Sequence, residues 1–188
     1  MKKTNSLLLI ALVSVTAVLS AEEAGKSTAV PPKENGKSLL KNGSFEDVDK
    51  NGNPKYWALR RGASLVKSES GNALKLEGVA SYAFELIWWD ELKQSPRERK
   101  IAFSFKASGK GSVKVGVFRY TDTKDPKAKN GYRRKNVGTD FAGPYQLTEK
   151  PQTFRGEYTV RADEWIGFGF LHAPGTAMID DVSIRLVK

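Results

Sequence analysis

The 188-residue chain contains no cysteine and a single histidine, His172. Without cysteine the chain can form no disulfide, no thiolate metal site and no lipid anchor on a cysteine behind a leader. One histidine with no nucleophile-elbow motif argues against a Ser-His-Asp hydrolase site. The sequence also lacks a P-loop, a dinucleotide-binding glycine fingerprint and an internal repeat, so nucleotide-dependent enzymes and repeat proteins are not indicated.

Long apolar runs are missing except near the N-terminus. There, residues 7–13 follow Lys2 and Lys3, and the small residues Ser20 and Ala21 provide a cleavage site. This pattern predicts a secretory signal peptide over residues 1–21. A membrane anchor is the alternative, but the apolar run ends by Leu19 and is shorter than the roughly 20 residues that span a bilayer. We therefore expect a secreted or periplasmic protein whose mature form has no transmembrane segment.

Acidic residues are outnumbered by basic ones, and the formal net charge is +10. Loss of Lys2 and Lys3 with the leader would reduce it to +8. A basic surface favours anionic partners such as an acidic polysaccharide, envelope lipid or nucleic acid, and export makes nucleic acid the least expected of these. The alternative is a lysine-rich surface that is simply solvated. Residues 22–38, rich in Glu, Lys, Gly, Ser and Pro, predict a disordered linker.

No segment after the leader has the 3.6-residue period of an amphipathic helix. Short alternating segments bounded by glycine and proline predict strands instead. The expected strands are residues 39–41, 63–68, 73–77, 81–89, 100–107, 112–120, 153–160, 165–171 and 177–186. Many short strands with such turns are typical of an antiparallel β-sandwich or barrel, so we predict an all-β domain over residues 39–188.

Residues 39–46 and 177–186 are expected to meet and close this domain. Asn42-Gly43 predicts a turn in the first segment, and Gly71-Asn72 predicts a hairpin turn. Residues 121–150 are predicted to be an irregular loop because Lys, Arg, Gly, Asn and Asp dominate them.

Alternation along each strand predicts which side chains face the core. We expect the core to receive Tyr82, Phe84, Leu86 and Trp88 from one strand, together with Trp57 and Trp165. In residues 112–120 the valines are better core candidates, which leaves Phe118 and Tyr120 on the outer side. The expected core also holds Ile101, Phe103, Phe105, Val113, Val115, Val117, Ile166, Phe168 and Phe170.

Four segments in this order resemble the carbohydrate-binding modules of families four and nine. They are residues 39–46 (LLKNGSFE), Pro54 with Trp57, residues 100–107 (KIAFSFKA) and residues 179–184 (IDDVSI). The resemblance implies a galactose-binding-like jelly roll that binds polysaccharide without cleaving it, often with a structural calcium ion near the meeting termini. It implies Glu46 and Asp181 as side-chain ligands of that calcium. Such modules are usually joined to a glycosidase, whereas residues 22–188 are expected to form only a linker and one β-sandwich.

Sugar rings stack on exposed aromatic rings beside hydrogen-bonding side chains. The predicted carbohydrate site therefore combines aromatic residues with one cation: Trp89, Phe118, Arg119, Tyr120, Tyr132 and Tyr145. For each ring taken alone, packing in the core or a loop is the alternative. Two other functions remain open. The basic segment 119–135 could bind an acidic polymer or an envelope partner in an adhesion or scaffold module, or the chain could be a small glycan-active hydrolase or lyase.

Overall fold

The computed structural model describes residues 38–78, 82–86, 96–129, 131–172 and 175–187. The predicted signal peptide, all of the predicted linker except Ser38, and Trp88 and Trp89 lie outside these residues. Within the described part of the chain, no helix is long and apolar enough to cross a membrane.

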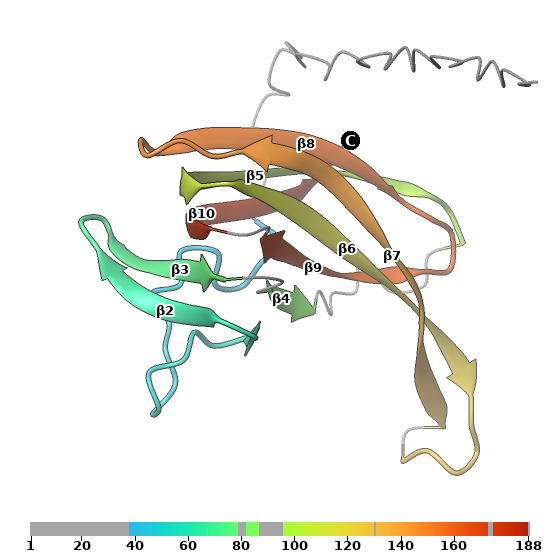
Figure 1. Ribbon diagram of the computed structural model, residues 1–188. Helices are drawn as coiled ribbons and strands as arrows, with labels where there is room; N and C mark the ends of the chain where they lie inside the picture. Colours follow the sequence, from blue (N-terminus) through green and yellow to red (C-terminus); the bar gives the residue numbers. More distant parts are fainter. Residues whose placement is uncertain (1–37, 79–81, 87–95, 130, 173–174, 188) are drawn as a thin grey trace, which may run out of the picture. The chain divides into compact units, whose positions relative to one another are not determined.

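Ten strands form two antiparallel five-stranded sheets (Figure 1). The front sheet has the order β1-β4-β9-β6-β7, and the back sheet has the order β2-β3-β10-β5-β8. The strands of the front sheet are β1 (Trp57–Arg60), β4 (Tyr82–Leu86), β9 (Trp165–His172), β6 (Ser112–Lys124) and β7 (Tyr132–Gln146). Those of the back sheet are β2 (Ala63–Ser68), β3 (Gly71–Glu77), β10 (Thr176–Leu186), β5 (Arg99–Lys110) and β8 (Gln152–Val160).

The core lies between the two sheets, where aromatic side chains from facing strands interlock. The rings of Phe103 and Phe168 lie 5.4 Å apart, and those of Phe105 and Phe170 lie 4.9 Å apart. The alternation predicted for β5, β6 and β9 is confirmed, because all nine of their predicted core residues are buried. Trp57 is also in the core as predicted, stacked on Phe170. The predicted antiparallel β-sandwich is therefore correct.

The predicted meeting of the chain's two ends is confirmed, but the first segment is not a strand. The Leu39 backbone N–H donates to the Ile184 carbonyl at 2.6 Å, and the Val182 N–H donates to the Gly43 carbonyl at 2.9 Å. Residues 39–45 leave strand geometry because the predicted turn forms, with the Phe45 N–H donating to the Asn42 carbonyl. The buried Asn42 side chain then bonds the backbone of Asp47 and Lys55, which fixes the following loop.

The predicted hairpin turn at Gly71-Asn72 is wrong by two residues. Ser68 pairs with Gly71, so the turn consists of residues 69 and 70, and Asn72 lies buried inside β3. The Asn72 N–H donates to the Glu46 carboxylate at 2.6 Å, and this bond keeps Asn72 in the strand.

The predicted irregular loop over residues 121–150 is also wrong. β6 continues to Lys124, and β7 runs from Tyr132 to Gln146 as the edge strand of the front sheet. Two register shifts interrupt the β6–β7 ladder, between Val113 and Val115 and between Arg119 and Tyr120. Because each β-bulge changes which side chains face inward, the sequence of β7 shows no simple alternation.

The predicted orientation of β4 is inverted. Ala83 and Glu85 are buried, whereas Tyr82 and Phe84 are half-buried on the outer side. The register explains this, because Ala83 pairs with Phe170 and Glu85 with Phe168, and paired residues share a face. Both faces of the front sheet carry aromatic residues, so hydrophobicity alone could not identify the inner face of β4.

Glu85 is a buried acid that ties β4 to the N-terminal segment. It is 1% exposed, and its Oε1 accepts a hydrogen bond from the Lys41 backbone N–H at 3.2 Å. Its Oε2 has no hydrogen-bond partner among the described residues. Burial raises the pKa of Glu85 from 4.5 to about 7, against the smaller opposing effect of the Lys41 N–H.

We expect Glu85 to make stability fall as pH rises from about 4.5 to 7. In that window the folded protein retains a proton that the unfolded chain has released, so the charged form is disfavoured by about 3 kcal/mol in total. Glu85→Gln should remove this slope and raise stability at pH 8. Urea unfolding of both proteins from pH 4 to pH 8 tests this, and parallel pH profiles would contradict it.

Candidate functional site

The outer face of the front sheet carries a group of aromatic side chains. In β6 and β9, every second residue fills the core, and the residues between them point away from it. We call the outward aromatic residues of four neighbouring strands the outer aromatic face: Tyr82, Phe84, Phe118, Tyr120, Phe141 and Trp165. Among these, Phe141 is 56% exposed, whereas Trp165 is only 4% exposed.

Phe84 and Phe118 form the centre of this face. Their ring centroids lie 5.1 Å apart with planes inclined by 45°, and Tyr82 stacks beside Phe84 at 6.4 Å. Two paired glycines, Gly116 and Gly169, lie beneath them. A Cβ at Gly169 would lie 2.5 Å from the Phe84 Cβ, and one at Gly116 would lie 2.6 Å from a Leu171 methyl. Glycine at both positions therefore lets large side chains lie across the sheet.

The second part of the face is a stack at the end of β9. Tyr120 and Trp165 are register partners whose rings lie 4.6 Å apart with planes inclined by 18°. The Arg134 guanidinium lies 3.9 Å from the Trp165 ring centroid, a cation–π contact. The prediction that Trp165 belongs to the core is therefore half right. It is buried, but it lies on the outer face beneath Tyr120 and Arg134.

The structure brings together two of the six predicted carbohydrate-site residues, Phe118 and Tyr120. Tyr145 instead packs inward, with its ring 5.3 Å from that of the core residue Phe105. Tyr132 is 48% exposed at the start of β7, near the end of the β6–β7 hairpin. Trp89 lies outside the described residues.

Arg119, the predicted cation of the site, faces the opposite side of β6 from Phe118 and Tyr120. Its guanidinium binds both oxygens of Glu164, at 2.8 and 3.0 Å, and an oxygen of Asp140 at 3.2 Å. The hydroxyl of Tyr158 donates to Asp140 at 2.7 Å. This network leaves the Arg119 side chain 12% exposed and committed to its two acids.

The network also sets the charge state of its members. The hydrogen bonds with Glu164 raise the pKa of Arg119 above its ordinary range. The Tyr158 hydroxyl, followed by the charge of Arg119, lowers the pKa of Asp140, and burial raises that of Tyr158. Asp140 therefore stays ionised at neutral pH. A carboxylate in this state is a poor general acid.

The two predicted calcium ligands have separate partners. The Glu46 carboxylate accepts hydrogen bonds from the Asn72 backbone and side chain, at 2.6 and 3.2 Å. Asp181, held at φ 49° in a β-bulge, pairs with Lys106 at 2.6 Å. The neighbouring Asp180 instead accepts a hydrogen bond from Ser70 at 3.1 Å, in the same turn region that Glu46 contacts.

These side chains do not by themselves meet the requirement of calcium for six to eight oxygen ligands. Among the described residues, no group of three or more His, Cys, Asp or Glu side chains could hold a metal ion. Backbone carbonyls would have to supply the other ligands. Glu46 and Asp180 both contact the turn region between β2 and β3, so this pair is better placed to share a calcium ion than Glu46 and Asp181.

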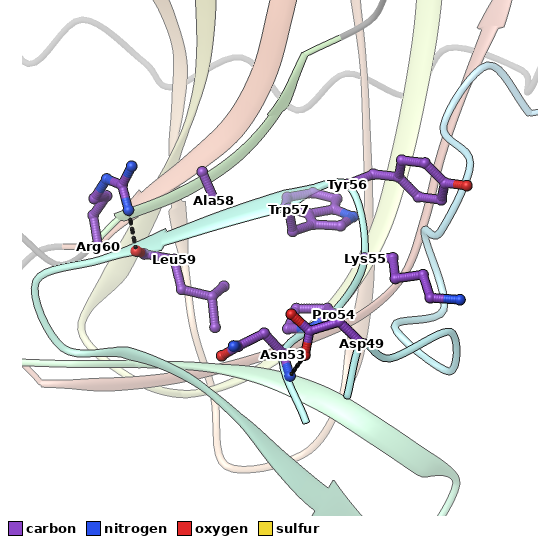
Figure 2. Close-up of a pocket in the computed structure, with 9 residues that line it drawn as sticks. All are labelled: Asp49, Asn53, Pro54, Lys55, Tyr56, Trp57, Ala58, Leu59 and Arg60. Atoms are coloured by element: carbon purple, nitrogen blue, oxygen red, sulfur yellow. Dashed lines mark hydrogen bonds between the residues drawn. The ribbon is translucent and has the colours of Figure 1, made fainter. Parts of the chain in front are cut away.

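A pocket of about 560 Å³ lies beside the edge strand β1 (Figure 2). It is lined by residues of the 49–60 segment, and two of its polar side chains, Asp49 and Arg60, already bond to the backbone of that segment. The Asp49 carboxylate accepts the Asn53 N–H at 2.9 Å, and the Arg60 guanidinium donates to the Leu59 carbonyl at 3.1 Å. The Tyr56 ring points away from the other lining side chains (Figure 2). The pocket therefore offers few polar groups that converge on a ligand, and the outer aromatic face is the stronger candidate site.

Four aromatic residues of the face were not in the predicted site: Tyr82, Phe84, Phe141 and Trp165. The inverted orientation of β4 concealed the first two, and the supposed loop concealed Phe141. The glycines of β9, which alternate with Ile166, Phe168 and Phe170, did indicate an outer surface with room above it.

The chain matches no family sequence model, and no curated protein matches it in sequence. Solved structures of similar fold do exist. The xylan-binding domain CBM22-1 of Paenibacillus barcinonensis Xyn10C is 18% identical, with a TM-score of 0.50 over 81% of this chain and 96% of that chain. A family 16 carbohydrate-binding module is 10% identical, with a TM-score of 0.50 over 79% of this chain and 99% of that chain.

The enzymatically active domain of tailspike protein 4 from bacteriophage CBA120 has a similar region. It is 15% identical, with a TM-score of 0.51 over 80% of this chain but only 21% of that chain. At these identities the shared property is the fold. The chain has the jelly-roll β-sandwich found in carbohydrate-binding modules, as its resemblance to that group predicted.

Proposed function

We propose that this protein is a non-catalytic carbohydrate-binding module that holds a polysaccharide chain against the outer aromatic face. The observation that carries the proposal is the Phe84–Phe118 pair, half-buried over Gly116 and Gly169 and continued by Tyr82, Tyr120 and Phe141. Rings held by a rigid sheet lose little conformational entropy on binding, and their faces suit the C–H faces of sugars. A similar fold in a xylan-binding domain adds support.

The test is retention of the protein lacking residues 1–21 on insoluble or gel-embedded polysaccharides. The panel contains neutral xylan, β-glucan and galactan and the acidic polymer polygalacturonate, each at low and high salt. Retention of the protein on at least one neutral glycan, unchanged by salt, is the expected result, because stacking does not depend on counter-ions. No retention on any polysaccharide, neutral or acidic, would remove the proposal.

A glycan-active hydrolase or lyase is the second candidate, because one region of an enzymatically active tailspike domain has a similar fold. Against it, Asp140 and Glu164 are both bound to Arg119, and the lowered pKa of Asp140 makes that carboxyl a poor general acid. Incubation with each retained polysaccharide, followed by measurement of new chain ends, separates the two functions. A binding module releases none.

We propose that the protein acts after export, since residues 1–21 have the pattern of a cleaved leader. Fractionation of producing cells, with N-terminal sequencing of the recovered protein, tests this. A mature N-terminus at or next to residue 22, in the periplasm or medium, is expected.

A structural calcium ion remains a prediction of the resemblance, with Glu46 and Asp181 as its proposed ligands and Asp180 as a further candidate. If the ion binds there, calcium should raise the melting temperature and a chelator should reverse the rise. Asp181→Ala should abolish the calcium-dependent rise if Asp181 is a ligand, and Asp180→Ala should do so if Asp180 is the ligand. An equal melting temperature with calcium and with chelator in the unmodified protein would contradict the prediction.

A further inference from the structure

The β6–β7 hairpin extends beyond the front sheet as a separate two-stranded arm. β9 pairs with β6 only as far as Tyr120, opposite Trp165, whereas β6 continues to Lys124. Among the described residues, the partner of this last part of β6 is the first part of β7, from Lys124 opposite Tyr132 to Thr121 opposite Lys135. Figure 1 shows the hairpin projecting away from the other strands of the sheet. We call residues 121–135 the arm.

The arm is ordered by its own hydrogen bonds and by its attachment to the outer aromatic face. In its turn, the Asp125 N–H donates to the Gly131 carbonyl and the Asp125 carboxylate accepts the Lys127 N–H, both at 2.9 Å. At its base, Arg134 lies on Trp165, which stacks on Tyr120. A ligand chain lying on the outer aromatic face would therefore meet the arm at one end.

The arm is strongly basic, and exposed cations without a paired carboxylate are concentrated on it. It contains six Lys and Arg residues against two Asp, a net charge of +4. Elsewhere many lysines lie beside a carboxylate: Lys55, Lys75, Lys100, Lys106 and Lys110. On the arm, the following cations are exposed and form no ion pair with another described residue: Lys124, Lys127, Lys129, Arg133 and Lys135.

A concentration of exposed, unneutralised cations on a projecting hairpin creates a positive potential that attracts polyanions. We infer that the arm extends the carbohydrate site, and that the ligand is an anionic polysaccharide bearing carboxylate or sulfate groups. This inference rests on the proposed function, in which a polysaccharide binds the outer aromatic face. The arm would bind the charged substituents of that same polysaccharide. Arg133 and Lys135 are two residues apart on β7, so their side chains share one face of the strand about 7 Å apart, and two neighbouring sugar units can each meet a cation there.

The test compares three variants with the unmodified protein. The arm variant carries Lys124→Gln, Lys127→Gln and Lys129→Gln, which leaves Arg134, Trp165 and Asp125 in place. The matched control carries Lys50→Gln, Lys67→Gln and Lys150→Gln, three exposed lysines outside the arm with the same total charge change. The third protein is Phe118→Ala. Affinity is measured for polygalacturonate, dextran sulfate and neutral xylan between about 50 and 200 mM salt, a range over which polyanion binding weakens steeply.

The unmodified protein is expected to bind at least one acidic polymer more tightly than xylan, with affinity falling more than about tenfold across that salt range. The arm variant should lose about tenfold in acidic-polymer affinity at low salt and most of the salt dependence, while the control stays within about twofold. Preference for polygalacturonate identifies carboxylate groups, and preference for dextran sulfate identifies sulfate groups.

Four results would overturn the inference. An equal loss in the arm variant and the control would show that net charge alone attracts the polymer. An unaffected arm variant would remove the arm from the site. A loss in the arm variant with none in Phe118→Ala would separate the arm from the aromatic face, so that the proposed function fails while charge-driven binding persists. Tight, salt-sensitive binding of DNA or anionic vesicles that exceeds binding of every polysaccharide would also overturn it.

Discussion

Phe118→Ala is expected to weaken polysaccharide binding about 10- to 50-fold while leaving the sandwich folded. The ring lies at the centre of the outer aromatic face, 5.1 Å from Phe84 and outside the core between the sheets. Loss of an aromatic surface that buries on the order of 50–100 Å² against a sugar costs about 1–2.5 kcal/mol of binding free energy. Isothermal titration with the best-retained polysaccharide measures the change, and circular dichroism checks the fold.

Tyr56→Ala is the matched control for Phe118→Ala. Tyr56 is an aromatic residue with 54% exposure, but it precedes β1 and its ring lies near Lys41 rather than on the outer aromatic face. Loss of the Tyr56 ring should leave polysaccharide affinity unchanged. If Phe118→Ala bound as tightly as the unmodified protein, or if Tyr56→Ala lost as much affinity, the site would have to be moved away from the outer aromatic face.

Arg119→Met is expected to lower the free energy of unfolding by roughly 2–4 kcal/mol, with no change in glycan affinity per folded molecule. The substitution keeps much of the side-chain volume but leaves Glu164, which is 15% exposed, without its bidentate partner. Removal of one member of a buried ion pair costs about 3–5 kcal/mol, and the 35% exposure of Asp140 reduces that figure here. Denaturant unfolding measures the loss.

Arg119→Lys should recover only part of the stability, because an ammonium group cannot form the two parallel bonds to Glu164. A double-mutant cycle with Glu164→Gln isolates the interaction. If Arg119→Met lost glycan binding but unfolded at the same denaturant concentration as the unmodified protein, Arg119 would belong to the binding site. Its ion pairs with Glu164 and Asp140 would then not be needed for stability.

Much of the fold could be predicted from period-two patterns in the sequence. The alternation of Val113, Val115 and Val117, and of Ile166, Phe168 and Phe170, placed both strands against the core. Such patterns are reliable where one face is apolar and the other polar or glycine-rich. The turn at Asn42-Gly43 and the meeting of the two ends were predictable for a similar reason, since local turn preference and a strand-like C-terminal segment were both present in the sequence.

The sequence by itself determined an all-β sandwich, its main core strands and the outward position of Phe118 and Tyr120. The tertiary structure decided three things that local patterns could not. It chose the inner face of β4, because apolar residues occupy both faces and only pairing with β9 distinguishes them. It made an edge strand of a polar, glycine-rich segment, because ladder bonds to β6 outweigh weak strand preference. It also committed Arg119 to Glu164 and Asp140, because these residues are distant in sequence and meet only when β6, β7 and the segment before β9 come together.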